Sequence, residues 1–218
     1  MIFSTLVNKC LHFVMSTCGK FNIDESHGVL HSMKVLQYAQ KIVDSEVDRH
    51  PFLQDQKGII ITSSLLHDTI DKKYMDLFTG LETLDSFLTS ECSNLLTKEE
   101  MEISKTIMKT MSYSVVKKQG YPSLGKYLSA YHIVREADLL SAYDLDRTII
   151  FSLARNRLQG KDASFDDVFK ETNDLLFSRM GKYVEDNLFV HEWSKNEATR
   201  LYFESIEQLK VWKEILRD

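Results

Sequence analysis

The chain has 218 residues, 43% apolar and 27% charged, proportions that are ordinary for a globular protein and exclude a disordered or collagen-like chain. Only two prolines and eight glycines are present, too few for the many turns of an all-β sandwich or barrel, so an all-helical domain over residues 1–218 is expected. The 27 basic and 32 acidic residues give a net charge of −5, which provides no long-range attraction for duplex nucleic acid or an anionic membrane.

The N-terminal segment, residues 1–19, is apolar enough for an export signal to be considered. It lacks a charged leading region, and Lys9 and His12 interrupt its apolar run. Apolar residues recur at steps of three and four instead, which predicts a packed amphipathic helix that ends at Gly19. No segment reaches the roughly 18 consecutive apolar residues of a membrane span.

The three cysteines point to a reducing environment. Their number is odd and no pair has C-x-x-C spacing, so neither a disulfide framework nor a thiolate zinc site is expected. We therefore expect a cytoplasmic protein.

Further helices are predicted along the chain from periodicity and capping signals. Residues 58–67 are ambiguous because three consecutive isoleucines favour a strand, but the segment also has a helical face and no partner strand is visible, so a buried helix is favoured. Capping boxes begin helices at Thr97 and Ser194, and Ser164 begins another. Residues 113–124 are predicted to form a loop. The helix that begins at Thr97 is predicted to run to about residue 111, and the helix that begins at Ser194 to about residue 216. The remaining predicted helices are 26–48, 77–87 and 131–158.

A histidine and an aspartate stand together after the apolar run Leu65–Leu66. A buried, unpaired carboxylate costs several kcal/mol or takes up a proton, and a divalent cation offsets that cost. The nitrogen of His67 and the oxygen of Asp68 suit metals such as zinc, manganese or iron. The pair alone is weak evidence, because His-Asp occurs often by chance and can simply end a helix.

Two further residues strengthen the metal hypothesis. His31 lies four residues before Val35 on an apolar helix face, and Asp138 has apolar neighbours on another helix. Together with His67 and Asp68, they can converge on one ion inside a helical core. Such a site leaves coordination positions open for water and substrate, as a catalytic site requires.

The order His31, His67-Asp68, Asp138 resembles that of the HD-domain superfamily of metal-dependent phosphohydrolases. The stretches SHGVLHSMKV, LLHDTIDKKY and READLLSAYDLDR resemble its small stand-alone members, with Lys34 in place of their Arg. The resemblance covers roughly residues 20–210. It implies a single HD-domain bundle with its core at about 20–160, helices 161–218 packed on it, and the metal site in the helical core.

The resemblance also implies a function and roles for individual residues. One divalent ion (Mn, Mg, Zn, Co, Ni or Fe) would bind the four residues, and metal-bound water would attack a nucleotide or other small phosphate ester or anhydride. Asp71 would act as a general acid/base and Lys73 would neutralise a phosphate oxygen. The implied substrate-binding residues are His27, Lys34 and Arg135.

Alternatives remain open for several of these residues. Asp71 could instead cap a turn or pair with Lys73, Lys72 and Lys73 could lie in a solvated loop, and His27 could be structural. Arg135 could pair with a surface carboxylate.

Two other functions remain open for the whole chain. Relatives often carry a His where this chain has Met111, which favours one metal over two. One alternative function is a catalytically silent protein that binds a nucleotide or a partner. The other is iron-dependent oxygenation, which the absence of a His at position 111 also disfavours. The sequence predicts no oligomeric state.

Overall fold

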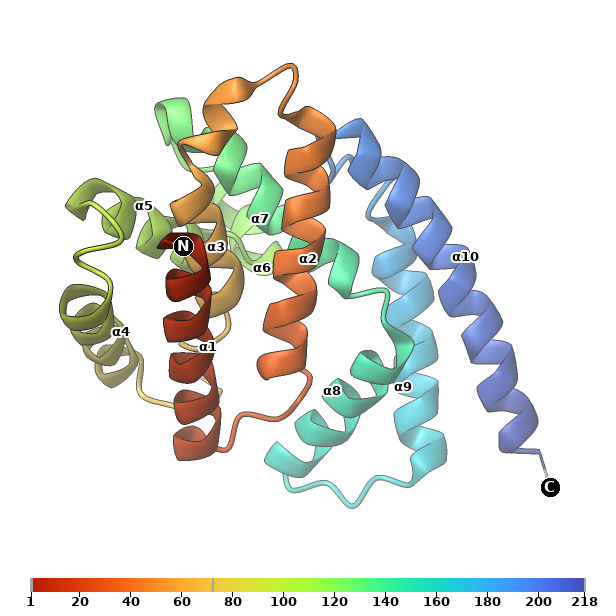
Figure 1. Cartoon of the computed structure of the whole chain (residues 1–218). Helices are drawn as coiled ribbons and strands as arrows, with labels where there is room; N and C mark the ends of the chain where they lie inside the picture. Colours follow the sequence, from red (N-terminus) through yellow and green to blue (C-terminus); the bar gives the residue numbers. More distant parts are fainter. Residues whose placement is uncertain (1, 72, 218) are drawn as a thin grey trace.

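The computed structural model in Figure 1 describes residues 2–71 and 73–217, and every regular element in these ranges is a helix. The predicted all-α class is therefore confirmed. No helix in these ranges is both long enough and apolar enough to span a bilayer. The helices are α1 (Ile2–Phe21), α2 (Val29–Glu46), α3 (Lys57–Leu66), α4 (Leu77–Glu91), α5 (Lys98–Thr110), α6 (Tyr113–Gln119), α7 (Leu128–Ser141), α8 (Leu145–Leu158), α9 (Phe165–Ser178) and α10 (Glu192–Ile215), with 3₁₀ turns η1 (Pro51–Gln54), η2 (Gly125–Tyr127) and η3 (Met180–Lys182).

Helix α3 is the buried element on which the arrangement depends. Every residue from Gly58 to Leu66 is buried, as predicted for this apolar segment. Its residues Ile59 and Ile60 belong to a core shared with α2 and α7, whereas Leu65 and Leu66 belong to a second core with α1 and α4. Helices α2, α3 and α7 pack against one another. Residues at the C-terminal end of α3 therefore lie close to both α2 and α7.

Two predicted helix ends near the N-terminus are wrong by a few residues. Helix α1 continues past Gly19 to Phe21, because the left-handed residue that ends it is Asn22, at φ 53°. The Ile23 N–H then donates to the Cys18 carbonyl at 3.1 Å, which closes the helix end. Helix α2 begins at Val29 rather than at 26, so His27 lies in the segment before the helix.

The predicted helix 131–158 is in fact two helices. Helix α7 ends at Ser141, and Asp144 caps α8 by accepting a hydrogen bond from the Arg147 N–H at 3.1 Å. The turn between them changes the direction of the chain (Figure 1). Hydrophobic periodicity continues through this turn and therefore concealed it.

The predicted loop 113–124 contains the short helix α6. Ser112 caps it by accepting from the Val115 N–H at 3.4 Å, and Gly120 ends it at φ 74°. A Ser before a short apolar run was the signal for this helix. The predicted capping box at Thr97 is confirmed, as is the helix start at Ser164.

The predicted capping box at Ser194 is wrong, because α10 begins at Glu192 and Ser194 is buried inside it. A carboxylate from α7 serves the N-terminus of α10 instead. The fully buried Glu136 side chain accepts from the Val190 N–H at 2.6 Å, and from the N–H and Nδ1 of His191 at 3.4 and 2.9 Å. This contact fixes α10 on α7.

Replacing Glu136 with alanine should therefore destabilise the whole chain. The change removes the acceptor of the hydrogen bonds from Val190 and His191, and we expect a loss of about 1–3 kcal/mol in the free energy of unfolding, measured by urea denaturation. The control is Glu207→Ala, which breaks an exposed pair with Lys210 and should cost at most about 1 kcal/mol. Equal urea midpoints for the two variants would contradict this role of Glu136.

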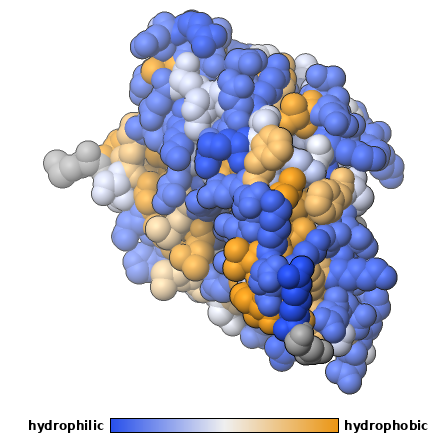
Figure 2. All heavy atoms as spheres, turned by 90° about the vertical axis from the view of Figure 1, so that its right-hand side faces the viewer, coloured by the Kyte–Doolittle hydropathy of each residue, from blue (hydrophilic) through white to orange (hydrophobic). Residues whose placement is uncertain are grey.

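The two outer groups of helices flank α2. In Figure 1, α1, α4 and α5 lie on one side of α2, and α8, α9 and α10 lie on the other. Figure 2 shows that hydrophilic side chains cover most of the face on which α10 lies, with apolar side chains between them. Exposed apolar residues on α10 include Phe203, Val211 and Ile215.

Candidate metal centre

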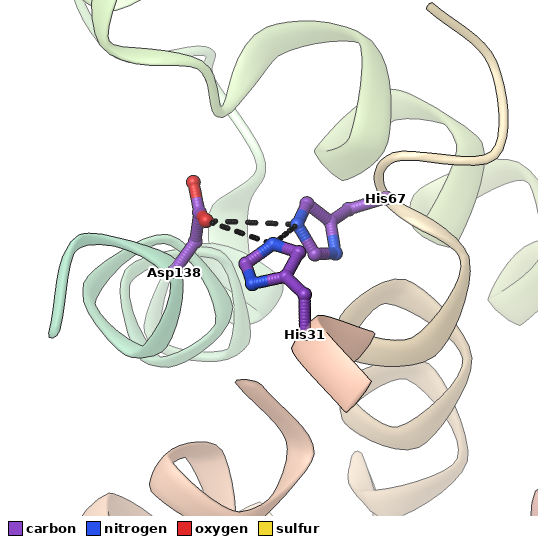
Figure 3. A group of neighbouring side chains, drawn as sticks. All are labelled: His31, His67 and Asp138. Carbon is purple, nitrogen blue, oxygen red and sulfur yellow. Dashed lines mark hydrogen bonds and ion pairs between the residues drawn. The ribbon is translucent and has the colours of Figure 1, made fainter. Parts of the chain in front are cut away.

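Figure 3 shows the polar cluster at the junction of α2, α3 and α7. His31 projects from α2, His67 follows the last residue of α3, and Asp138 projects from α7. The two Nε2 atoms are 2.9 Å apart, and Asp138 Oδ1 lies 3.5 and 3.6 Å from those of His31 and His67. This group of side chains could hold a metal ion.

Asp68 is the fourth member of the cluster. Its Oδ2 lies 3.0 Å from Nε2 of His31 and 3.2 Å from Nε2 of His67. The imidazoles are 0% and 3% exposed, whereas the side chains of Asp68 and Asp138 are 21% and 27% exposed. The cluster is thus closed behind the histidines and accessible from the carboxylate side.

Hydrogen bonds on the far side of each ring fix which nitrogen faces the cluster. His67 Nδ1 lies 2.9 Å from the Ser64 carbonyl, which can only accept, so Nδ1 carries a proton. His31 Nδ1 lies 3.4 Å from the Ser141 hydroxyl, which donates to the Asp138 carbonyl and so accepts from the ring. Both Nε2 lone pairs therefore point into the cluster. Acceptors that face one another repel unless a proton or a cation lies between them, and a two-nitrogen, two-oxygen set fits a divalent metal.

In the metal-free cluster, the neighbouring charges favour a proton at this position. Burial opposes the charge on His67, yet the carboxylates of Asp68 and Asp138 raise its pKa to about 10. Burial opposes the charge on Asp138 as well, but its hydrogen bond to His67 lowers its pKa to about 2. Burial, and then the charge of Arg147, lower the pKa of His31 to about 4. Between these two values the charged form of His67 and the neutral form of His31 are favoured.

These pKa values predict how stability depends on pH. In chelator-treated protein, the contribution of His31 to the free energy of unfolding is lost as pH falls from 6.5 toward 4, because the unfolded chain then takes up a proton that the folded protein does not. The contribution of His67 is lost as pH rises from 6.5 toward 10, because the unfolded chain then releases a proton that the folded protein still holds. The contribution of the site should therefore be largest near pH 6.5. A bound metal displaces the proton of His67, so the increase in Tm on adding Mn²⁺ should grow with pH above 6.5. Thermal unfolding with and without Mn²⁺ measures this, and an increase that is constant with pH would contradict it.

The cluster opens into a cavity of about 710 Å³. Apolar side chains from α4, α5 and α9 line part of it, and the rest is polar, with five cationic and three acidic side chains among the described residues. The volume suits a ligand of nucleotide size. The charged and imidazole-bearing residues of its wall are His27, His67, Asp68, Asp71, Lys73, Lys105, Lys109, Asp138, Arg147 and Arg179.

Three of the other sequence-predicted residues line this cavity. Asp71 lies in the turn after α3, not on a continuing helix, and its carboxylate accepts from the Lys73 N–H and pairs with Lys73 Nζ, both at 2.9 Å. His27 Nε2 lies 3.4 Å from the same Nζ. Lys72 is outside the described residues.

The other two predicted substrate-binding residues are not at the cavity. Lys34 lies on the exposed side of α2, with its ammonium 5.3 Å from the centre of the Tyr38 ring. Arg135 is 1% exposed, and its Nη1 donates to the Leu188 carbonyl at 2.6 Å. Their positions do not support substrate binding by either residue.

Sequence reasoning missed four cations of the cavity wall. Arg147 lies nearest to the cluster, with Nη2 3.2 Å from His31 Nε2 and Nε donating to the Ser26 carbonyl at 2.6 Å. Its signal was its place in the READLLSAYDLDR stretch, nine residues after the last predicted ligand. Lys105, Lys109 and Arg179 carried no comparable signal.

Comparison of the chain with models of protein families, with curated proteins and with solved structures finds no match.

Proposed function

We propose that this chain is a metal-dependent phosphohydrolase that acts on a nucleotide or another small phosphate ester or anhydride. The observation that carries the proposal is the cluster of His31, His67, Asp68 and Asp138, because three of its members line a cavity whose wall, in the part of the chain that the structure describes, also carries five cationic side chains. The order of His31, His67-Asp68 and Asp138 along the chain, which resembles that of the HD-domain superfamily, supports it. His31, His67, Asp68 and Asp138 would hold one divalent ion.

The chain's own residues divide the remaining tasks. A divalent ion held by these residues would supply hydroxide near neutral pH, because a metal can lower the pKa of bound water from 15.7 to about 7. Lys73 and Arg147 would neutralise phosphoryl oxygens near the cluster. Asp71 lines the cavity and would move a proton to or from the reacting groups. Apolar side chains of α4 and α9 line the other side of the cavity.

A substrate panel tests this proposal. The protein is stripped with chelator and then assayed on nucleotides, sugar phosphates and an aryl phosphate with Mn²⁺, Mg²⁺, Zn²⁺, Co²⁺, Ni²⁺ or Fe²⁺. We expect turnover that requires one of these metals, disappears with chelator and returns when the metal is added back. Nucleotide binding without turnover under any metal would overturn the proposal in favour of a silent binding protein, and oxygen uptake with Fe²⁺ would favour an oxygenase.

A further inference from the structure

A second polar network lies beside the metal cluster, in the segment before α2. The Asp24 carboxylate accepts from the Ser26 hydroxyl and from the Tyr74 hydroxyl, each at 2.5 Å, and from the Ser26 N–H at 2.9 Å. His27 Nδ1 lies 2.7 Å from the Ser26 hydroxyl and 3.3 Å from that of Tyr74. His27 itself is 8% exposed and lines the cavity.

Counting donors fixes the tautomer of His27. Ser26 and Tyr74 each have one hydroxyl hydrogen, and the Asp24 carboxylate, which can only accept, takes both. Their oxygens can therefore only accept from His27 Nδ1. The proton of a neutral His27 is then on Nδ1, and Nε2 presents a lone pair.

The charge state of each group agrees with this assignment. Burial, together with the charges of Lys73 and Arg147, lowers the pKa of His27 and favours its neutral form. Burial opposes the ionisation of Asp24, but hydrogen bonds from Ser26 and Tyr74 lower its pKa, so the carboxylate is charged.

The lone pair of His27 faces the ammonium of Lys73. Nζ of Lys73 lies 3.4 Å from His27 Nε2 and 2.9 Å from Asp71 Oδ2, so two of its three N–H donors have partners. The Phe151 ring, centred 5.7 Å from Nζ, supports the ammonium on another side. One donor remains for a ligand in the cavity.

We infer that Asp24, Ser26, Tyr74 and His27 form a hydrogen-bonded chain that positions the Lys73 ammonium for a phosphoryl oxygen of the substrate. The inference rests on the proposed function for the identity of the ligand. It also revises the role predicted for His27, because a lone pair on Nε2 repels a phosphate oxygen. His27 and Asp24 are positioning residues, and Lys73 is the residue that contacts the substrate.

The tautomer of His27 is the first test, and it needs no activity. Long-range ¹H–¹⁵N spectra of the chelator-treated protein, assigned with a His27→Phe variant, report which ring nitrogen carries the proton. We expect Nδ1–H in the wild type. In Asp24→Asn, the amide NH₂ donates to one of the hydroxyl oxygens and turns its hydrogen toward Nδ1, so Nε2–H should become populated. Nε2–H in the wild type, or an unchanged spectrum in Asp24→Asn, would overturn the inference.

Phosphate affinity is the second test. Binding of inorganic phosphate to the metal-loaded protein should weaken about tenfold in Asp24→Asn and in His27→Phe, the loss of one hydrogen bond to a charged group. On the substrate found by the panel, KM should rise while metal content is unchanged, and exposed Asp48→Asn should match the wild type. If both variants retained wild-type phosphate affinity and KM, the positioning role would be wrong. If the wild type neither bound phosphate nor turned over any substrate, the proposed function would fail, and the tautomer result would still decide the chain of hydrogen bonds.

Discussion

The variant Asp68→Ala is expected to lose both the bound metal and all measurable hydrolysis. Its carboxylate lies within 3.2 Å of both histidine Nε2 atoms and supplies charge that offsets that of the cation. Residues that only orient a ligand typically contribute about 10–100-fold, so removal of a ligand should exceed that range. Metal content by elemental analysis and turnover are measured on the same sample.

Asp48→Ala is the matched control, because Asp48 is an exposed aspartate that does not line the cavity. This control should retain one metal per chain and full turnover. Wild-type turnover in Asp68→Ala would show that the metal site is wrongly assigned.

The variant Asp71→Asn should keep its metal but react about 10²–10⁴-fold more slowly, the usual contribution of a general acid or base. The amide has nearly the same shape and still accepts from the Lys73 N–H, so the turn after α3 is retained. It cannot take up a proton, so the change separates proton transfer from packing. Turnover and metal content of the purified variant are the measurements.

The competing interpretation is that Asp71 only pairs with Lys73, whose side chain is 45% exposed. Loss of such a pair would cost at most about 1 kcal/mol of stability and leave turnover intact. Full activity with full metal would remove Asp71 from the mechanism, and loss of metal would make it a ligand.

Local signals predicted helices well but failed where a distant residue decides the structure. The box at Thr97 works because both of its partners lie within one turn. The same pattern at Ser194 is overridden, because Glu136, more than fifty residues earlier, binds Val190 and His191 just before α10 and the helix begins at Glu192. The turn at Asp144 was missed because the apolar positions of α7 and α8 continue one periodic pattern through it.

The site shows the same division between local and tertiary information. His31, His67 and Asp138 were predicted to converge because polar side chains on apolar helix faces can meet in the core, and in the structure these three side chains lie together. The sequence could not tell which of Arg135 and Arg147 lies at the cavity, because both occur in one continuous periodic stretch. Only the break after α7 directs Arg147 toward the cluster, while Arg135 turns to the Leu188 carbonyl.

The most direct test of the metal centre is an anomalous difference map from crystals soaked in Mn²⁺. We predict one strong peak per chain, at about 2.0–2.3 Å from Nε2 of His31 and His67 and from carboxylate oxygens of Asp68 and Asp138. A peak elsewhere, or a map in which these four side chains lie more than about 4 Å from any common centre, would contradict the account.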